Sequence, residues 1–415
     1  MAFNIGLSGV NAAQVDLKTT GNNIANTSTI GFKASRAEFA DIYANSKYGT
    51  TQVSTGYGVR TAAISQQFTQ GGMTFTEKNL DVAINGEGFF NVERSNGETA
   101  YTRNGQFQID KNGYIVTNSA DKLLGFDENG SPIPLEISSE QIDPLITSEI
   151  TLSANLDAAS NIIDSAIEFD RDDPDSYNNT TALTTYDSFG NAMLTSIYFR
   201  KNEPTLVDGD PDSANWSVYT RTTDSQGNAM NNGPFEVAFS PTGALSSIDE
   251  DSLATKFSIE LAHDLTAASL QPIEIDISKL SQYGADFAVN DLNQDGYTTG
   301  SLSGVEIGQD GNVQTRYTNG ESKIVGQIIL TTFNNPQGLS EIGGNKWLKS
   351  GESGDPTNNI PGGSNVGVLQ AGALEQANVD LTKELINLII SQRNFQANAK
   401  TLTTADTVTQ AAIQL

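Results

Sequence analysis

The chain contains no cysteine and only one histidine, His263. The absence of cysteine excludes disulfide bonds, thiolate metal sites and cysteine nucleophiles. A single imidazole cannot form a zinc site with the usual ligands, and no serine stands in the G-x-S-x-G sequence of an α/β-hydrolase. There is no P-loop, and Gly86-Glu87-Gly88 lacks the third glycine of a dinucleotide fingerprint. We therefore expect no enzymatic activity, no cofactor and no metal.

Positive charge is also scarce: 23 Lys and Arg face 50 Asp and Glu, for a net charge of −27. Such a chain repels phosphate backbones and anionic membranes, so we expect no nucleic-acid partner. The longest strongly apolar stretch, Leu385–Ile390, contains Asn387 and is far too short for membrane insertion. Lys18 is the first basic residue, so the basic segment of a cleaved signal peptide is lacking. If the protein is exported, we expect a route without such a peptide.

The charge is uneven along the chain. Residues 1–50 sum to +1 and residues 366–415 sum to −1, so the middle holds essentially all the negative charge. Near-neutral ends can pack against copies of themselves, whereas an acidic middle stays soluble.

Both ends carry apolar residues at helical, heptad-like spacing. The positions are Leu7, Val10, Leu17 and Ile24 at the N-terminus and Leu374, Leu381, Leu388, Phe395 and Leu402 at the C-terminus. This spacing predicts a helix from about Asn4 to Thr27, a second helix near the C-terminus, and a helical seam between them. An apolar stripe is more often ordinary core. Its presence at both ends of one chain favours coiled-coil arms used in assembly.

Between these ends the sequence is typical of strands and turns. Asn-Gly pairs, the strongest short hairpin signal, separate the first group of apolar segments. The predicted strands are Leu80–Ile84, Gly88–Glu93, Phe107–Ile109, Tyr114–Val116, Leu183–Tyr186, Met193–Phe199, Trp216–Thr220, Phe235–Phe239 and Phe257–Leu261.

These patterns predict a multidomain fold in which α-helical coiled-coil arms enclose nested, mainly-β domains. The arms are residues 1–31 with 364–415, and an extended connector covers 32–70. One β domain combines 71–147 with 286–360, and an outer β domain, 148–285, is inserted into it. The composition of Gly351–Gly363 predicts a linker that leads back to the C-terminal arm. This plan suits a polymer subunit better than an enzyme.

One segment resembles half of a calcium-binding loop. Asp291, Asn293, Asp295 and Gly296 fit its first half, but Leu302 stands where a bidentate glutamate should close it. We interpret the segment as an Asx-rich turn.

The N-terminal segment Gly21–Lys33 resembles the signature of bacterial flagellar rod and hook proteins. The residues that carry the resemblance are Asn22, Asn23, Asn26, Gly31, Phe32 and Lys33. Glu375–Leu381 and Gln392–Lys400 resemble the closing helix of this family. Thr185–Asn191, Asp295–Leu302 and Phe333–Leu339 are similar to its hook branch, and the 148–285 insertion argues against a distal rod subunit.

The resemblance implies a structural protein that self-assembles into a curved, flexible tube, which couples the motor rod to the filament and transmits torque. It implies an extracellular place in the flagellum, reached through the flagellar export apparatus. The implied partners are further copies of the chain, the distal rod protein, the hook cap and the hook–filament junction proteins. An exported acidic β-rich adhesin or polysaccharide-binding protein is the alternative, and it would not need the terminal arms.

Overall fold

The computed structural model shows how the two ends and the β-rich middle are built. It describes residues 2–42, 56–127, 130–138, 141–203, 214–224, 226–249, 251, 254–259 and 272–413. His263 and residues 43–55 of the predicted connector lie outside the described residues.

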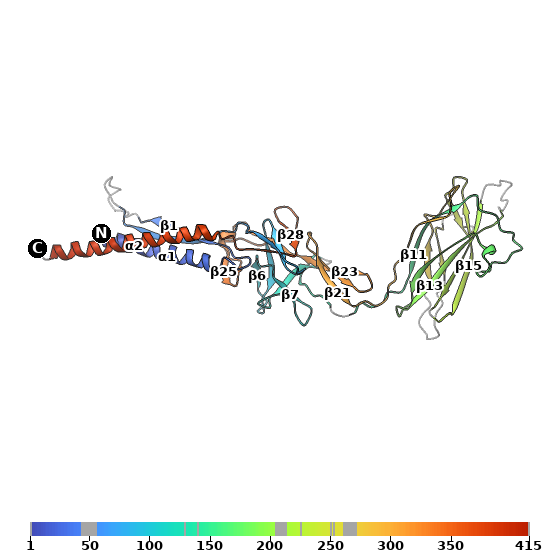
Figure 1. Ribbon diagram of the computed structural model, residues 1–415, viewed down its shortest axis with the longest axis horizontal. Helices are drawn as coiled ribbons and strands as arrows, with labels where there is room; N and C mark the ends of the chain where they lie inside the picture. The colour runs from blue at the N-terminus through green and yellow to red at the C-terminus, as the bar shows by residue number, and fades with distance from the viewer. Residues whose placement is uncertain are drawn as a thin grey trace. The chain divides into compact units, whose positions relative to one another are not determined.

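The chain forms two compact units (Figure 1). Unit 1 comprises Met1–Ser139, Ser303–Arg316 and Ser322–Leu415, and unit 2 comprises Glu140–Leu302 and Tyr317–Glu321. The predicted insertion 148–285 lies within unit 2. Residues 286–302 also belong there, rather than to the inner β domain as predicted, because β20 (Ala288–Gln294) pairs with β11 (Glu149–Asp157).

The described part of the chain has two α-helices, α1 (Ala2–Ala25) and α2 (Leu381–Ile413), both in unit 1. They lie side by side and antiparallel, with Gly6 near Leu402 and Asp16 beside Ser391 (Figure 1). The bounds of α1 are close to the prediction. The second arm is shorter than predicted, because residues 368–375 are strands rather than helix. Neither described helix is long and apolar enough to span a membrane.

Unit 1 is otherwise built of strands. After α1, β1 (Ser35–Asp41) and β2 (Val59–Gln66) pair as an antiparallel ladder where the sequence predicted an extended connector. The others are β3 (Met73–Phe75), β4 (Val82–Asn85), β5 (Phe89–Glu93), β6 (Thr99–Thr102), β7 (Phe107–Ile109), β8 (Ile115–Thr117), β9 (Lys122–Phe126), β10 (Pro132–Pro134), β21 (Leu302–Ile307), β22 (Asn312–Tyr317), β23 (Ser322–Ile328), β24 (Leu330–Thr332), β25 (Ser340–Gly343), β26 (Lys346–Leu348), β27 (Thr357–Asn359), β28 (Val368–Ala371) and β29 (Ala373–Glu375), with a 3₁₀ turn at Pro336–Gly338.

The main sheet of unit 1 runs in the order β21-β22-β23-β9-β5-β6-β26-β25. Strands from both sides of unit 2 in the sequence therefore share one sheet. β27 pairs with β24, so the predicted linker Gly351–Gly363 also contributes a strand. The last two strands pair with early strands of unit 1, since β28 pairs with β4 and β29 with β3.

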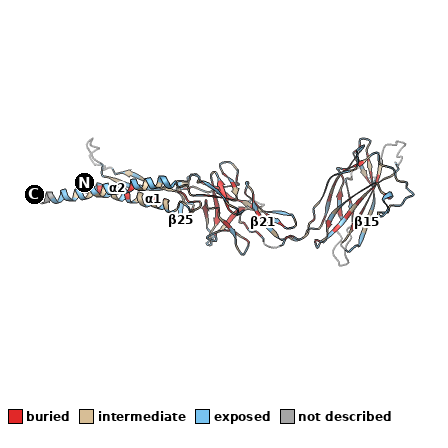
Figure 2. Ribbon diagram, viewed as in Figure 1, coloured by how far each residue is buried: buried red, intermediate tan, exposed pale blue. Residues whose placement is uncertain are grey.

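An aromatic cluster forms part of the core of unit 1. Trp347, Phe89, Tyr101 and Phe333 are buried together, and the partly buried Phe68 packs against them. The Phe68 ring meets those of Phe89 and Trp347 edge-on, with centroids 5.5 Å apart in both cases. Edge-to-face contacts of this kind add stability beyond the burial of apolar surface. The buried positions concentrate on the strands, while long faces of both helices stay exposed (Figure 2).

Unit 2 consists of two five-stranded sheets with one core between them. Along β13 and β14 every second residue is buried, as expected for strands with one face on a core, and Trp216 is fully buried. One sheet contains β11, β17 (Lys256–Ile259), β18 (Ile273–Asp276), β19 (Ser281–Tyr283) and β20; the other contains β12 (Asn179–Tyr186), β13 (Ala192–Lys201), β14 (Ala214–Thr223), β15 (Ala229–Phe239) and β16 (Leu245–Ile248). A 3₁₀ turn covers Pro174–Ser176.

Candidate functional site

Three charged side chains meet inside unit 1, where the first and last parts of the chain come together. Lys33 Nζ lies 2.7 Å from one carboxylate oxygen of Glu375, and Arg103 Nη1 lies 3.3 Å from the other. The side chains of Lys33 and Glu375 are fully buried, and that of Arg103 is 4 % exposed. We call these three residues the junction cluster.

Backbone groups complete the junction cluster. Lys33 Nζ also donates to the carbonyl oxygen of Thr69 at 2.8 Å, and the Gly71 N–H donates to the Glu375 carboxylate at 2.9 Å. The Gly31 N–H donates to the backbone carbonyl of Glu375, also at 2.8 Å. The end of α1, the segment after β2 and the strand β29 are therefore joined at one point. Removing one partner from such a buried pair leaves an uncompensated charge, which is strongly destabilising.

Burial dominates the electrostatics of the two cations. It lowers the pKa of Lys33 below the ordinary value of 10.5; the Glu375 carboxylate opposes this effect and the Arg103 guanidinium adds to it. Burial likewise lowers the pKa of Arg103, and Glu375 again opposes. Two buried cations thus depend on one carboxylate.

Two asparagines tie the helices to this junction. The Asn23 side chain, on α1, donates to the Ser35 carbonyl at 2.8 Å and accepts from the Ser35 N–H at 2.9 Å. Asn378, just before α2, accepts from the Ala34 N–H at 2.7 Å and donates to the Gln67 carbonyl at 2.6 Å. A side-chain amide that pairs with backbone in this way replaces a missing strand neighbour. Both helices therefore leave the β part from fixed points.

The remaining signature residues shape the turn after α1. The Asn26 side chain donates to the Asn22 backbone carbonyl at 3.0 Å, and its amide oxygen accepts from the Thr29 hydroxyl. Phe32 is buried. Gly31 has φ +69°, and a Cβ there would lie 2.7 Å from the Arg103 carbonyl carbon. Glycine is required at this position both by conformation and by space.

The seam residues predicted from heptad spacing do not form a buried stripe between α1 and α2. Leu7, Leu381 and Phe395 are 43 %, 46 % and 38 % exposed. Val10, Leu17, Ile24, Leu388 and Leu402 are only partly buried. The placement of Leu374 on a helix was wrong: it is a buried residue of β29, where the chain pairs with β3 before α2 begins.

Small and polar residues make the contact between the helices instead. Ala12 and Ala13 are buried on α1, and a Cβ added to Gly9 would lie 2.5 Å from the side-chain oxygen of Asn398 on α2. Ser391 of α2, which is fully buried, donates to the Asp16 carboxylate. Small residues let two helices approach closely. Leu7, Leu381 and Phe395 stay exposed, whereas Leu402 lies near Gly6 of α1.

No role for Arg103, Glu375, Asn378 or Gly9 was predicted from the sequence. One signal was available for Glu375. Leu369 and Ala373 are apolar and Glu375 continues their alternation, which is the pattern of one strand face. A carboxylate at a buried strand position requires a cation, and Lys33 in the signature was a candidate. Nothing in the sequence points to Arg103 as the second cation.

The segment that resembles half of a calcium-binding loop makes hydrogen bonds within the protein. The Asp295 carboxylate accepts from the N–H groups of Ser148 and Glu149 at 2.8 and 3.0 Å, and Asn293 donates to Asp291. These hydrogen bonds occupy the oxygens that a cation would need. Among the described residues no group of three or more His, Cys, Asp or Glu side chains is placed to hold a metal ion.

Four family models match successive parts of the chain. They are the flagella basal body rod protein model at residues 3–33, the FlgE/F/G D1 domain model of flagellar hook protein at 83–165, the FlaE D2 domain model of flagellar basal body protein at 155–297, and the FlgEFG C-terminal model of flagellar basal body rod at 370–415. The first and last of these cover α1 and α2, the elements joined by the junction cluster.

Curated relatives match over their whole length. The flagellar hook protein FlgE of Salmonella typhimurium is 35 % identical over 430 residues, covering 100 % of both chains, and that of Escherichia coli is 35 % identical over 429 residues with the same coverage. FlgE of Borreliella burgdorferi is 28 % identical over 99 % of this chain and 98 % of its own.

A solved structure shares the fold. The Helicobacter pylori flagellar hook protein FlgE2 superposes with a TM-score of 0.56 at 16 % identity, and the match covers 73 % of this chain and 100 % of that one. Together with full-length matches at 35 % identity, these similarities confirm the resemblance that rests on Asn22–Lys33: the chain belongs to the flagellar hook protein family.

Proposed function

We propose that this chain is the structural subunit of a bacterial flagellar hook, where copies of it polymerise within the flagellar axis. The observation that carries the proposal is the full-length match to hook proteins at 35 % identity. It is a structural role and not an enzymatic one. The adhesin alternative has no support from the comparisons.

The terminal helices are the elements that we assign to assembly. α1 and α2 contact each other through small and polar residues, which leaves Leu7, Leu381 and Phe395 exposed. Contiguous exposed apolar side chains mark interaction surfaces. In the polymer these side chains would pack against neighbouring copies, so the seam predicted from the heptads would be a contact between subunits and the helices would act as coiled-coil arms.

We assign the β parts to the outside of the tube, with the nested domain arrangement predicted from the sequence. The distal rod protein, hook cap and hook–filament junction proteins would contact the ends of the polymer. Passage through the flagellar export apparatus without a cleaved signal peptide would place the subunit outside the cell. The polymer would then be a curved, flexible tube that couples the rod to the filament and transmits torque.

Deleting the gene in the native bacterium tests this function. The expected mutant is non-motile and has basal bodies with a rod but no hook and no filament. The full chain should restore the hook, and a chain without α2 (Leu381–Ile413) should not. An adhesin would instead leave the flagella of the deletion strain intact.

A further inference from the structure

Unit 2 holds a cavity that the structural role does not explain. Carboxylates dominate this unit, which has only six basic side chains. Three of the six are arginines, and all three, Arg171, Arg200 and Arg221, line one cavity of about 730 Å³. It lies on the face of the β12–β16 sheet opposite the core, bordered by residues 163–171. Such a convergence of cations in an acidic unit is the feature that needs an account.

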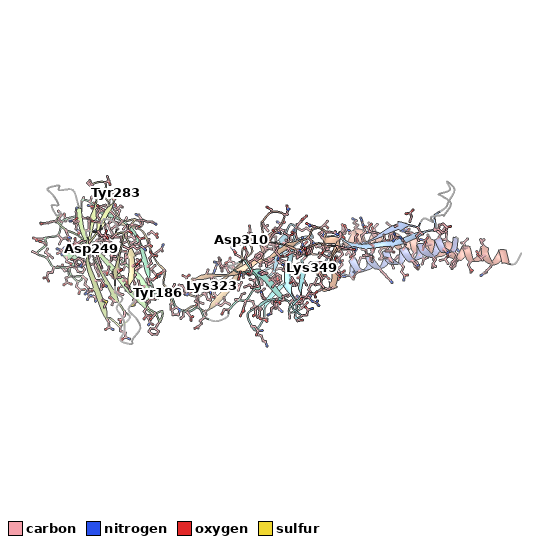
Figure 3. The ribbon with its side chains drawn as sticks, turned by 180° about the vertical axis from the view of Figure 1, so that it is seen from behind. Tyr186, Asp249, Tyr283, Asp310, Lys323 and Lys349 are labelled. Carbon is pink, nitrogen blue, oxygen red and sulfur yellow. The ribbon has the colours of Figure 1, made fainter. Side chains whose placement is uncertain are left out.

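The Glu236 carboxylate lines the cavity and is held in place by hydrogen bonds. The Glu236 carboxylate accepts from the Ser217 hydroxyl at 2.9 Å and from the Asn202 amide at 3.3 Å. The Glu236 backbone is held as well, because its N–H donates to the Asp249 carboxylate and its carbonyl accepts from the Asp249 N–H, both at 2.7 Å. Asp249 is labelled on unit 2 in Figure 3.

The three arginines differ in how far their donors are already used, and Arg171 pairs with Asp172 through Nε at 3.2 Å. Arg200 is 6 % exposed and donates to the carbonyls of Ile167 and Asp164 at 2.8 and 3.0 Å, but its buried Nε has no hydrogen-bond partner among the described residues. A buried donor without a partner is destabilising. Arg221, which lines the cavity, donates through Nε to the Thr223 hydroxyl at 3.2 Å, and its two Nη groups have no protein acceptor among the described residues.

An aromatic pair supplies an apolar surface. Phe169 stacks on Tyr219 with ring centroids 4.0 Å apart and planes inclined by 6°, and both residues line the cavity. Cavities that combine such a surface with a few fixed polar groups are the usual form of small-ligand sites.

We propose that this cavity binds a carboxylated sugar. The arginine guanidinium groups would take the carboxylate, since their planar fork matches its two oxygens. The Glu236 carboxylate would accept from a ring hydroxyl, and the Phe169–Tyr219 pair would border the ring. The inference goes beyond the role in the hook and does not rest on it.

The acidic side chains that line the cavity argue against a compact anion as its ligand. Glu168, Asp170 and Glu203 also line the cavity, and they would repel a phosphate or sulfate ion placed among the arginines. Each ring of a sugar acid carries its carboxylate on one side and neutral hydroxyls on the other, so the hydroxyls can face the carboxylates of the cavity. Its chemistry therefore fits both sides of the cavity.

Calorimetric titration of the full chain with trigalacturonate tests the proposal, with maltotriose and inorganic phosphate as parallel probes. Trigalacturonate should bind with a Kd of about 1 mM or tighter, and the two others should bind at least about tenfold more weakly. Arg221→Ala should weaken trigalacturonate binding about tenfold or more. Lys279→Ala makes the same charge change in unit 2 away from the cavity and should have no effect.

The Glu236→Gln variant distinguishes a sugar acid from a simple inorganic anion as the ligand. Loss of the carboxylate acceptor should weaken trigalacturonate several-fold, whereas an anion held only by charge would bind more tightly once a negative charge is gone. Tighter binding by this variant would overturn the proposal. So would equal binding of maltotriose or phosphate, no effect of Arg221→Ala, or no trigalacturonate binding at about 10 mM. Far-ultraviolet circular dichroism of each variant establishes that it is folded.

Discussion

Two buried cations share a single carboxylate in unit 1, and this arrangement joins residues that lie more than three hundred positions apart. Glu375 faces Lys33 and Arg103 in a site from which water is excluded. Taking charges out of water is costly, and only close pairing with hydrogen bonds offsets the cost. The junction is therefore sensitive to the loss of Glu375 in a way that surface pairs are not.

Glu375→Gln is expected to lower the unfolding free energy of unit 1 by about 3–5 kcal/mol, because both cations lose their counter-charge. Glu38→Gln is the matched control: Glu38 pairs with Arg36 at the surface, and its loss should leave the unfolding free energy nearly unchanged. Denaturant titrations followed by Trp347 fluorescence in a Trp216→Phe background report on unit 1 alone. Equal costs for the two substitutions would show that the cluster does not hold the junction.

The lowered pKa of Lys33 predicts a pH dependence. In the unfolded chain the amine keeps its proton up to about 10.5, whereas in the folded chain it loses the proton at lower pH because of burial. Between the two pKa values the unfolded state binds more protons, so the unfolding free energy rises with pH in that window, and below it this group causes no change with pH.

Chemical denaturation of the native chain and of Lys33→Met at pH values from about 7 to 10.5 checks this dependence. The difference between the two unfolding free energies should change in favour of the native chain as the pH rises. A difference that stays constant over the whole range would mean that the pKa of Lys33 is not lowered by folding.

At the scale of elements, α1 and α2 pack through a surface that heptad spacing does not reveal. Gly9 and Ala13 of α1 and Ser391 of α2 lie where the helices meet, and several side chains that carried the heptad pattern stay exposed. Leu388 is half-buried in the isolated subunit. If its remaining surface contacts neighbouring copies, a charge there should affect assembly far more than folding.

Leu388→Asp is therefore expected to abolish polymerisation while the β parts keep their melting temperature. An unpaired carboxylate in a packed interface costs several kcal/mol. Leu388→Met keeps the apolar volume and should still polymerise. Sedimentation under assembly conditions measures the polymer, and circular dichroism of the monomer measures melting. Tubes of normal length formed by the Asp variant would contradict the assigned role of this face.

The elements differ in how far the sequence predicts them. α1 and short strands such as β7 follow directly from periodicity and Asn-Gly turns, because these signals are local. Leu374 was misassigned since β29 gains its structure from pairing with β3, about three hundred residues away, and a seven-residue interval cannot reveal that. The junction cluster depends on three distant segments, so the sequence shows Lys33 within a motif, gives one strand-pattern signal for Glu375, and gives none for Arg103.

For the whole molecule, the distribution of charge and motif over the two units is consistent with a polymer subunit. Signature residues and both helices lie in unit 1, while the acidic residues are concentrated in unit 2. Like-charged surfaces resist loose association, so specific contacts through the near-neutral helices would govern assembly. A polymer built in this way should require both arms and tolerate change in unit 2.

Electron microscopy of the purified full chain tests the central claim most directly. Under conditions that promote self-assembly, at high protein concentration and with salt to screen the acidic surface, the chain should form curved tubes or extend hook fragments added as seeds. A chain without α2 should form none. If the full chain instead stays monomeric, fails to extend the seeds, or forms tubes equally well without α2, then the account of this protein as a hook subunit assembled through its terminal helices is wrong.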